Sequence, residues 1–143
     1  MSDTALAAAY RATFNRLKGP SEWWENRVYP DMGPTQAAYP YVIFFYSGGG
    51  ARNAVRKNDA NLMLTVQCIS DDMATALAGA ARVEELLDDH GQFDNSTDYL
   101  YGGASWHILT ITQEEILHLV EQFAQAVPIY HEGARYRFIM EAV

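Results

Sequence analysis

The sequence predicts one α+β domain, residues 1–143, built from a mixed or antiparallel β-sheet with two main helices packed on one face. Three observations lead to this. Two segments repeat apolar residues at helical spacing, and several strand-length segments are rich in β-branched and aromatic residues. The order of the segments is helix, strands, helix, strands, which is typical of an α+β sheet rather than of alternating βαβ units.

The first helix is expected over residues 3–18, where apolar residues recur every three or four positions. Ser2 or Asp3 can cap its start, and Gly19-Pro20 ends it. The stripe consists of Leu6, Ala9, Tyr10, Thr13, Phe14 and Leu17. Trp23 and Trp24 follow, and because neighbours cannot share one face, we expect one to pack inward and the other to lie at a surface.

Two strands are expected next, at residues 27–29 and 41–46. The first ends at Pro30, and the second, YVIFFY, predicts a buried strand near the middle of the sheet. A Gly- and Pro-containing loop separates them. The glycines 48–50 then open a polar stretch to about Asn61, which lacks the Lys-Ser/Thr pair of a phosphate loop and predicts a long hairpin loop.

Residues 62–69 alternate as a further strand, with Leu62, Leu64, Val66 and Cys68 on one face. Ser70-Asp71-Asp72 caps the second helix, which Gly91 is expected to end. Its apolar stripe is marked by Met73, Leu77, Ala80, Ala81, Glu84 and Leu87, and is widened by Val83 and Leu86.

The C-terminal third is expected to hold a loop at 91–105, a strand at 106–112 and a last strand at 135–140. Between these strands, residues 113–125 are ambiguous. Ile116, Leu117, Val120 and Phe123 suit a helix, whereas Ile116, His118 and Val120 also alternate as in a strand.

Charge is distributed unevenly over a net −8. Residues 71–98 hold eight acidic side chains against Arg82 alone, whereas residues 1–70 hold seven basic and five acidic ones. The acidic field disfavours a general nucleic-acid-binding surface. The loop around Arg52, Arg56 and Lys57 is the region that remains available for an anionic partner.

Enzymatic motifs are absent from the local sequence. His90, His107, His118 and His131 form no metal-ligand spacing, and GxSxG does not occur. The lone Cys68 lies in an apolar stretch that predicts a buried, inert thiol. Adjacent carboxylates on a helix point about 100° apart and do not converge on a substrate. We therefore expect no catalytic residue, metal or cofactor.

Targeting and membrane segments are likewise not indicated. No apolar run reaches the ~18 residues that a spanning helix needs. The N-terminus has no basic start followed by an apolar core. We expect a protein that is made and folded in the cytoplasm and contacts no membrane.

The arrangement of several anchors resembles the tail terminator, or tail completion, family of long-tailed phages and prophages. These anchors are the short N-terminal helix, the segments RVYP at 27–30, YPYVI at 39–43 and TVQCI at 65–69, and the alanine-rich helix at 74–87. The resemblance covers about residues 5–90. It then rests on a final Tyr-Arg-Phe strand at 136–138, after a turn at His131-Glu132-Gly133.

The resemblance implies a non-enzymatic virion protein that forms a ring, expected to be a hexamer, on the last ring of tail tube protein. Such a ring ends tube polymerisation and offers a docking surface to the head connector. DNA would pass through its lumen without specific binding, and we expect the acidic segment 71–98 to face that lumen. The Arg52, Arg56 and Lys57 loop would contact an acidic neighbour.

Two alternatives remain open at this point. One is another neck or head-completion protein of the same particle, which would differ only in its neighbours. The other is a non-viral α+β domain that binds a small ligand, which would need a concave apolar pocket with a few convergent polar groups.

Overall fold

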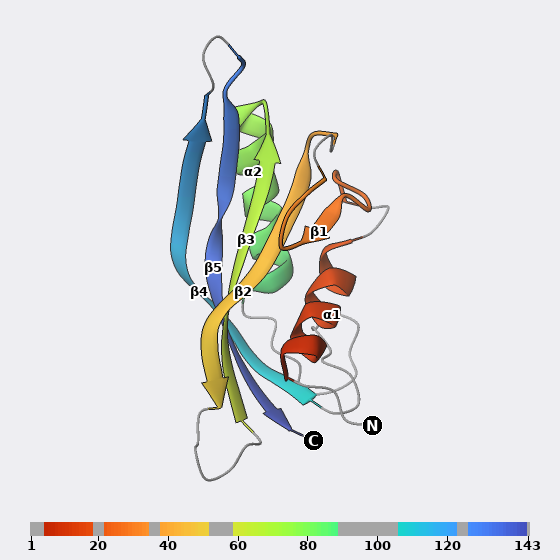
Figure 1. Cartoon of the computed structure of the whole chain (residues 1–143), viewed down its shortest axis with the longest axis vertical. Helices are drawn as coiled ribbons and strands as arrows, with labels where there is room; N and C mark the ends of the chain where they lie inside the picture. Colours follow the sequence, from red (N-terminus) through yellow and green to blue (C-terminus); the bar gives the residue numbers. More distant parts are fainter. Residues whose placement is uncertain are drawn as a thin grey trace.

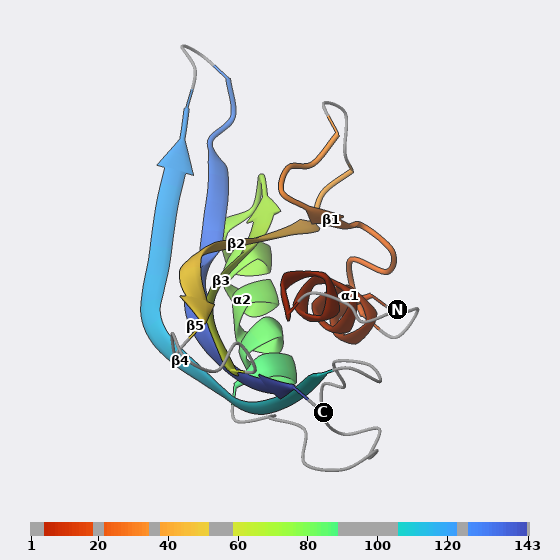
Figure 2. The same cartoon turned by 60° about the horizontal axis from the view of Figure 1, so that its bottom comes forward.

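The computed structural model of the chain describes residues 5–18, 22–34, 38–51, 59–88, 106–122 and 126–142. Two helices and one five-stranded sheet follow in the order α1 (Ala5–Leu17), β1 (Val28–Pro30), β2 (Tyr41–Ala51), β3 (Asp59–Ser70), α2 (Met73–Leu87), β4 (Trp106–Glu121) and β5 (Ile129–Ala142). In the sheet the order is β1-β2-β3-β5-β4, with β1 parallel to β2 and all other pairs antiparallel. Both helices cover the same face (Figures 1 and 2). The predicted α+β fold class is confirmed.

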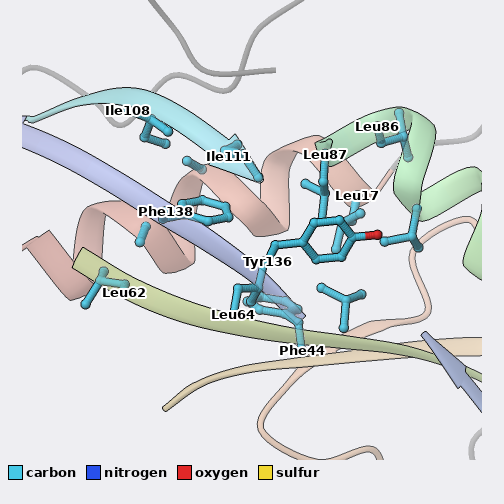
Figure 3. Close-up of a cluster of buried hydrophobic side chains, with 14 of the residues drawn as sticks. Leu17, Phe44, Leu62, Leu64, Leu86, Leu87, Ile108, Ile111, Tyr136 and Phe138 are labelled. Atoms are coloured by element: carbon cyan, nitrogen blue, oxygen red, sulfur yellow. The ribbon is translucent and has the colours of Figure 1, made fainter. Parts of the chain in front are cut away.

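The core lies between the two helices and this face of the sheet. Alternate residues of β3 point into it: Leu62, Leu64, Val66 and Cys68 are all buried, as the alternation predicts. From β5 come Tyr136 and Phe138, whose rings lie among leucine and isoleucine side chains of both helices and of β4 (Figure 3). One continuous apolar cluster therefore joins α1, α2 and the sheet.

The first helix is fixed to β2 through a tyrosine. The hydroxyl of Tyr46 lies 2.7 Å from the Thr13 hydroxyl and donates to the Ala9 carbonyl at 3.2 Å. The buried face differs in detail from the predicted stripe, because Ala8 and Ala12 are buried whereas Leu6 is exposed. Small residues allow the helix to approach the sheet closely, which spacing alone does not show.

The tryptophan pair divides as the sequence predicts. Trp24 is fully buried, and its indole N–H donates to the Leu17 carbonyl at 2.7 Å. That carbonyl belongs to the last turn of α1, where no helical partner exists, so Trp24 satisfies one of the free acceptors there. Trp23 is half exposed on the other side of the turn.

The second helix begins where the sequence predicts. Asp72 is the N-cap and its carboxylate accepts from the Thr75 amide at 3.0 Å. The helix ends at Leu87, with Asp88 as C-cap, and the expected stop at Gly91 lies outside the described residues. Its buried stripe is Ala76, Gly79, Val83, Leu86 and Leu87. The stripe is thus rotated from the predicted one, and Met73 and Leu77 are exposed.

The C-terminal half forms a long hairpin, and two expectations change there. Residues 113–121 continue β4 and pair with β5, so the ambiguity over this segment is resolved as strand. The predicted turn at His131-Glu132-Gly133 is wrong, because these residues lie inside β5, which also extends beyond the expected 135–140. Glycine suggested a turn, but here it lies where β5 passes close to β3: a Cβ at Gly133 would lie 1.8 Å from the Val66 carbonyl oxygen.

The N-terminal hairpin is also longer than predicted. Strand β2 runs through the glycines to Ala51, and β3 begins at Asp59, with a register shift between Ser47 and Gly50. The antiparallel pairing confirms a hairpin between the two strands. Strand β2 is buried on one face only: Val42 and Phe44 are fully buried, whereas Ile43 and Phe45 are half-buried on the open face.

Replacing Gly79 with alanine is expected to destabilise the fold, although alanine is better in a helix by about 1 kcal/mol. A Cβ at position 79 would lie 2.2 Å from Cys68 Sγ and 2.9 Å from Cys68 Cβ. We expect a loss of about 1–3 kcal/mol in the free energy of unfolding, measured by urea denaturation. In the Gly79→Ala/Cys68→Ala double variant the loss should be smaller than the sum of the two single losses. A higher urea midpoint for Gly79→Ala would contradict the close approach.

Candidate interface between α2 and β4

The second helix lies over β3 and β5 and leaves β4 largely uncovered (Figure 1). At its C-terminal end the helix is tied to β4, because the Asp88 carboxylate accepts from the Gln113 amide at 2.8 Å. Beside this tie a pocket of ≈ 190 Å³ lies between the helix and the hairpin. Its walls are Leu77, Ala80, Ala81 and Glu84 of α2, and Gln113, Ile116, Gly133, Ala134 and Tyr136 of β4 and β5.

Both sides of this pocket carry exposed apolar side chains. On α2, Met73 and Leu77 are 47% and 44% exposed, and on β4, Ile116 and Val120 are 77% and 44% exposed. The register places Val120 opposite Tyr130 and Ile116 opposite Ala134, on the face that bears the helices. We call the pocket with these four flanking side chains the α2–β4 groove.

Few polar groups converge on the α2–β4 groove. Burial, with a smaller contribution from the charges of Glu84 and Asp88, raises the pKa of the Tyr136 phenol well above its ordinary value, so the hydroxyl stays neutral. A second hollow of ≈ 420 Å³ adjoins the groove and is lined by Asp88, Gln113, Glu114, Glu115 and Ile116. The lining of the α2–β4 groove itself suits apolar side chains of a protein partner better than a polar substrate.

Strand β4 is also the free edge of the sheet on this side. Its first part has the features that usually protect an edge: register shifts near Thr110 and Glu114, and ion pairs from Glu114 and Glu115 to arginines of β5. Residues 116–120, ILHLV, have no register shift, proline or lysine. Their one ionisable side chain, His118, contacts the buried Glu132. This segment is therefore an exposed apolar edge.

The opposite edge of the molecule, beside β1, carries a different apolar surface. Trp23, Met32 and Tyr39 are 52%, 79% and 41% exposed. Arg27 joins two of the segments that carry them, donating to the Trp23 carbonyl at 3.1 Å and to the Pro40 carbonyl at 2.9 Å. Tyr39 also stacks on Tyr41, with ring centroids 5.8 Å apart. We call these three exposed side chains the β1-edge surface.

Charge differs between the two edges. The segments 71–88 and 106–122 contain eight carboxylates and one arginine, Arg82, whereas residues 5–34 contain four basic and three acidic side chains. Arg82 itself is held by Glu22 and Glu85, at 2.8 Å and 3.0 Å, and these hydrogen bonds raise the pKa of its guanidinium above the ordinary value. Within the subunit, Arg82, Arg135 and Arg137 neutralise part of the acidic excess on the α2–β4 side by pairing with Glu85, Glu115 and Glu114.

The site predicted from the sequence consists of other residues. Arg52, Arg56 and Lys57 fall outside the described residues, so their role stays a prediction. Sequence reasoning missed the α2–β4 groove because Leu77 and Ile116 are far apart along the chain. Two signals pointed towards it: Met73 and Leu77 extend the apolar surface of α2, and residues 116–120 are apolar at both alternating sets of positions.

Metal and nucleophile chemistry has little support in the described part of the chain. No group of three or more His, Cys, Asp or Glu side chains is arranged there so that it could hold a metal ion. Among the same residues, no helix is long and apolar enough to cross a membrane. Cys68 is buried, as predicted, and burial raises the pKa of its thiol to about 12, which leaves it protonated at neutral pH.

No protein-family model and no curated protein matches this sequence. The fold is similar to that of a chain in the solved virion of a native gene transfer agent particle, with a TM-score of 0.60. The similarity covers 97% of this chain and 99% of that chain at 18% sequence identity. At this identity the similarity shows a shared fold.

The Cys68 thiol is expected to resist modification in the folded protein. It is 1% exposed and protonated, so a thiol reagent such as 5,5′-dithiobis(2-nitrobenzoate) at pH 8 should label less than a tenth of the protein in an hour. In guanidinium chloride the same reagent should label one thiol per chain. Rapid labelling without denaturant would contradict the burial of this residue.

Proposed function

We propose that this protein is a structural virion protein that forms a ring, most simply a hexamer, at the head-proximal end of a phage tail tube. The ring ends polymerisation of the tube and provides the docking surface for the head connector. The observation that carries the proposal is the fold similarity to a chain of a gene transfer agent virion, which extends over nearly the whole of both chains.

The resemblance noted in the sequence supports the tail terminator role within that class. Its N-terminal anchors form consecutive elements of one structure: RVYP ends in β1, YPYVI begins β2, TVQCI lies in β3, and the alanine-rich segment is α2. These elements build the core, so the resemblance rests on residues that determine the fold. This support is independent of the structural comparison, which uses geometry.

The surface of the subunit suits an assembly protein. Two separate apolar surfaces, the α2–β4 groove and the β1-edge surface, are exposed in the single chain, and such patches usually mark contacts with other proteins. The partners we propose are further copies of the chain, the tail tube protein and the head connector. The net charge of −8 would repel DNA phosphates and let DNA pass through the lumen without specific binding.

A ligand-binding role has less support from the geometry. The pocket in the α2–β4 groove has ≈ 190 Å³, below the roughly 300–1,000 Å³ of typical small-molecule sites. The adjoining hollow is larger, but three carboxylates line it. An assembly role accounts for the exposed apolar side chains around both, whereas a ligand site would enclose them.

Deletion of the gene is expected to give headless tails of irregular and excessive length, because nothing would stop the tube from growing. Tail length is measured by negative-stain electron microscopy of an induced lysate. A plasmid copy of the gene should restore tails of uniform length joined to heads, which serves as the control.

Two other results would decide against the terminator role. Tails of normal length beside unjoined heads would identify a neck or head-completion protein instead. Normal infectious particles would contradict both virion roles and favour the ligand-binding alternative.

A further inference from the structure

The two apolar surfaces lie on opposite sides of the subunit and differ in shape. Strand β4, which contributes to the α2–β4 groove, is one edge of the sheet, and β1, whose neighbouring segments carry the β1-edge surface, is the other edge, beside α1 (Figures 1 and 2). The first is a hollow with apolar sides. The second presents three large side chains, two of them aromatic and one a methionine, and Arg27 joins the segments that carry the two aromatic ones.

Each surface has the composition of a protein contact. Tryptophan, tyrosine and methionine are enriched at the centres of interfaces, and the β1-edge surface consists of one of each. Conversely, an apolar edge such as residues 116–120 is normally covered in a functional protein, since an open edge pairs or aggregates. Ile116 is 77% exposed, so its side chain is largely open to solvent.

We propose that the α2–β4 groove of one subunit binds the β1-edge surface of the next copy of the same chain. This is a head-to-tail contact between two unlike surfaces, which repeats around a ring when the rotation closes. The inference rests on the proposed ring and adds which surfaces join its subunits. Trp23 and Met32 of one copy would lie against Leu77 and Ile116 of the next.

Charge complementarity favours a second copy as the occupant. On the groove side, residues 71–88 carry five carboxylates against Arg82, and residues 5–34, which include Trp23 and Met32 of the β1-edge surface, carry four basic and three acidic side chains. When the groove side of one copy faces the β1-edge side of the next, the opposite charges attract, whereas two groove sides facing each other would repel. A two-fold symmetric contact through the groove is therefore disfavoured. The contact also places the groove-facing side of α2 between subunits. Of the acidic segment that we expect to face the lumen, only the carboxylates on the other sides of α2 would then be available there.

Cross-linking in assembled particles tests the contact. A Trp23→Cys/Ile116→Cys variant is supplied in place of the wild-type gene, and purified particles are treated with a short bismaleimide. Because the two positions lie at opposite edges, they should not join within one subunit. We expect a ladder of covalent dimers, trimers and larger species that ends at the ring. Either single variant should give no ladder, since a head-to-tail link needs both cysteines and Cys68 is buried.

The matched control is Trp23→Cys/Thr112→Cys, in which the second cysteine lies on β4 at an exposed position opposite Arg137, on the face away from the helices. It should give no ladder. A second pair, Met32→Cys/Leu77→Cys, repeats the test at neighbouring positions of both surfaces and should give the same ladder as the first pair.

The outcomes separate the contact from the proposed function. Particles that contain the protein by immunoblot but give no ladder with either test pair would overturn the contact and leave the virion role standing. Dimers from Ile116→Cys alone would also overturn it, because they would show groove facing groove. Particles without the protein would overturn the virion role and the contact together.

Discussion

The close approach of α2 to β3 determines the arrangement of the rest of the molecule. Gly79 allows the helix to lie directly on Cys68, because any Cβ at that position would overlap the sulfur. In this position the helix covers β3 and β5, and its buried apolar residues pack in the core around Tyr136. A single helix cannot also cover β4, and α1 lies at the far end of the sheet. The exposed second half of β4 and the α2–β4 groove follow from this placement.

The same arrangement connects stability with assembly. The core is complete within one chain, since the inner faces of both helices and of the sheet are buried without a second protein chain. Most of the large apolar side chains left exposed belong to the α2–β4 groove or to the β1-edge surface. A subunit of this kind can fold first and associate afterwards, as a ring component requires. Unlike surfaces at opposite edges favour a repeating contact rather than a closed dimer.

Sequence patterns predicted the fold where one local cause decides the structure. Asp72 caps α2 through its own carboxylate, and alternation in β3 follows from burial of one face. Residues 113–121 stayed ambiguous because periodicity reports burial, and here apolar side chains occur on both faces of an edge strand. Gly133 suggested a turn for a similar reason: its role is a contact with β3, distant in sequence. The α2–β4 groove depends on two such distant segments, so no local pattern defines it.

We propose that this protein occupies one ring at the junction of tail and head. Immunogold electron microscopy of purified particles, with an antibody raised against the chain, tests it most directly. For such a ring we expect gold at a single position on each particle, where the tail joins the head, and none on particles from a strain without the gene. Label along the whole tail, on the capsid or on no particle would contradict it.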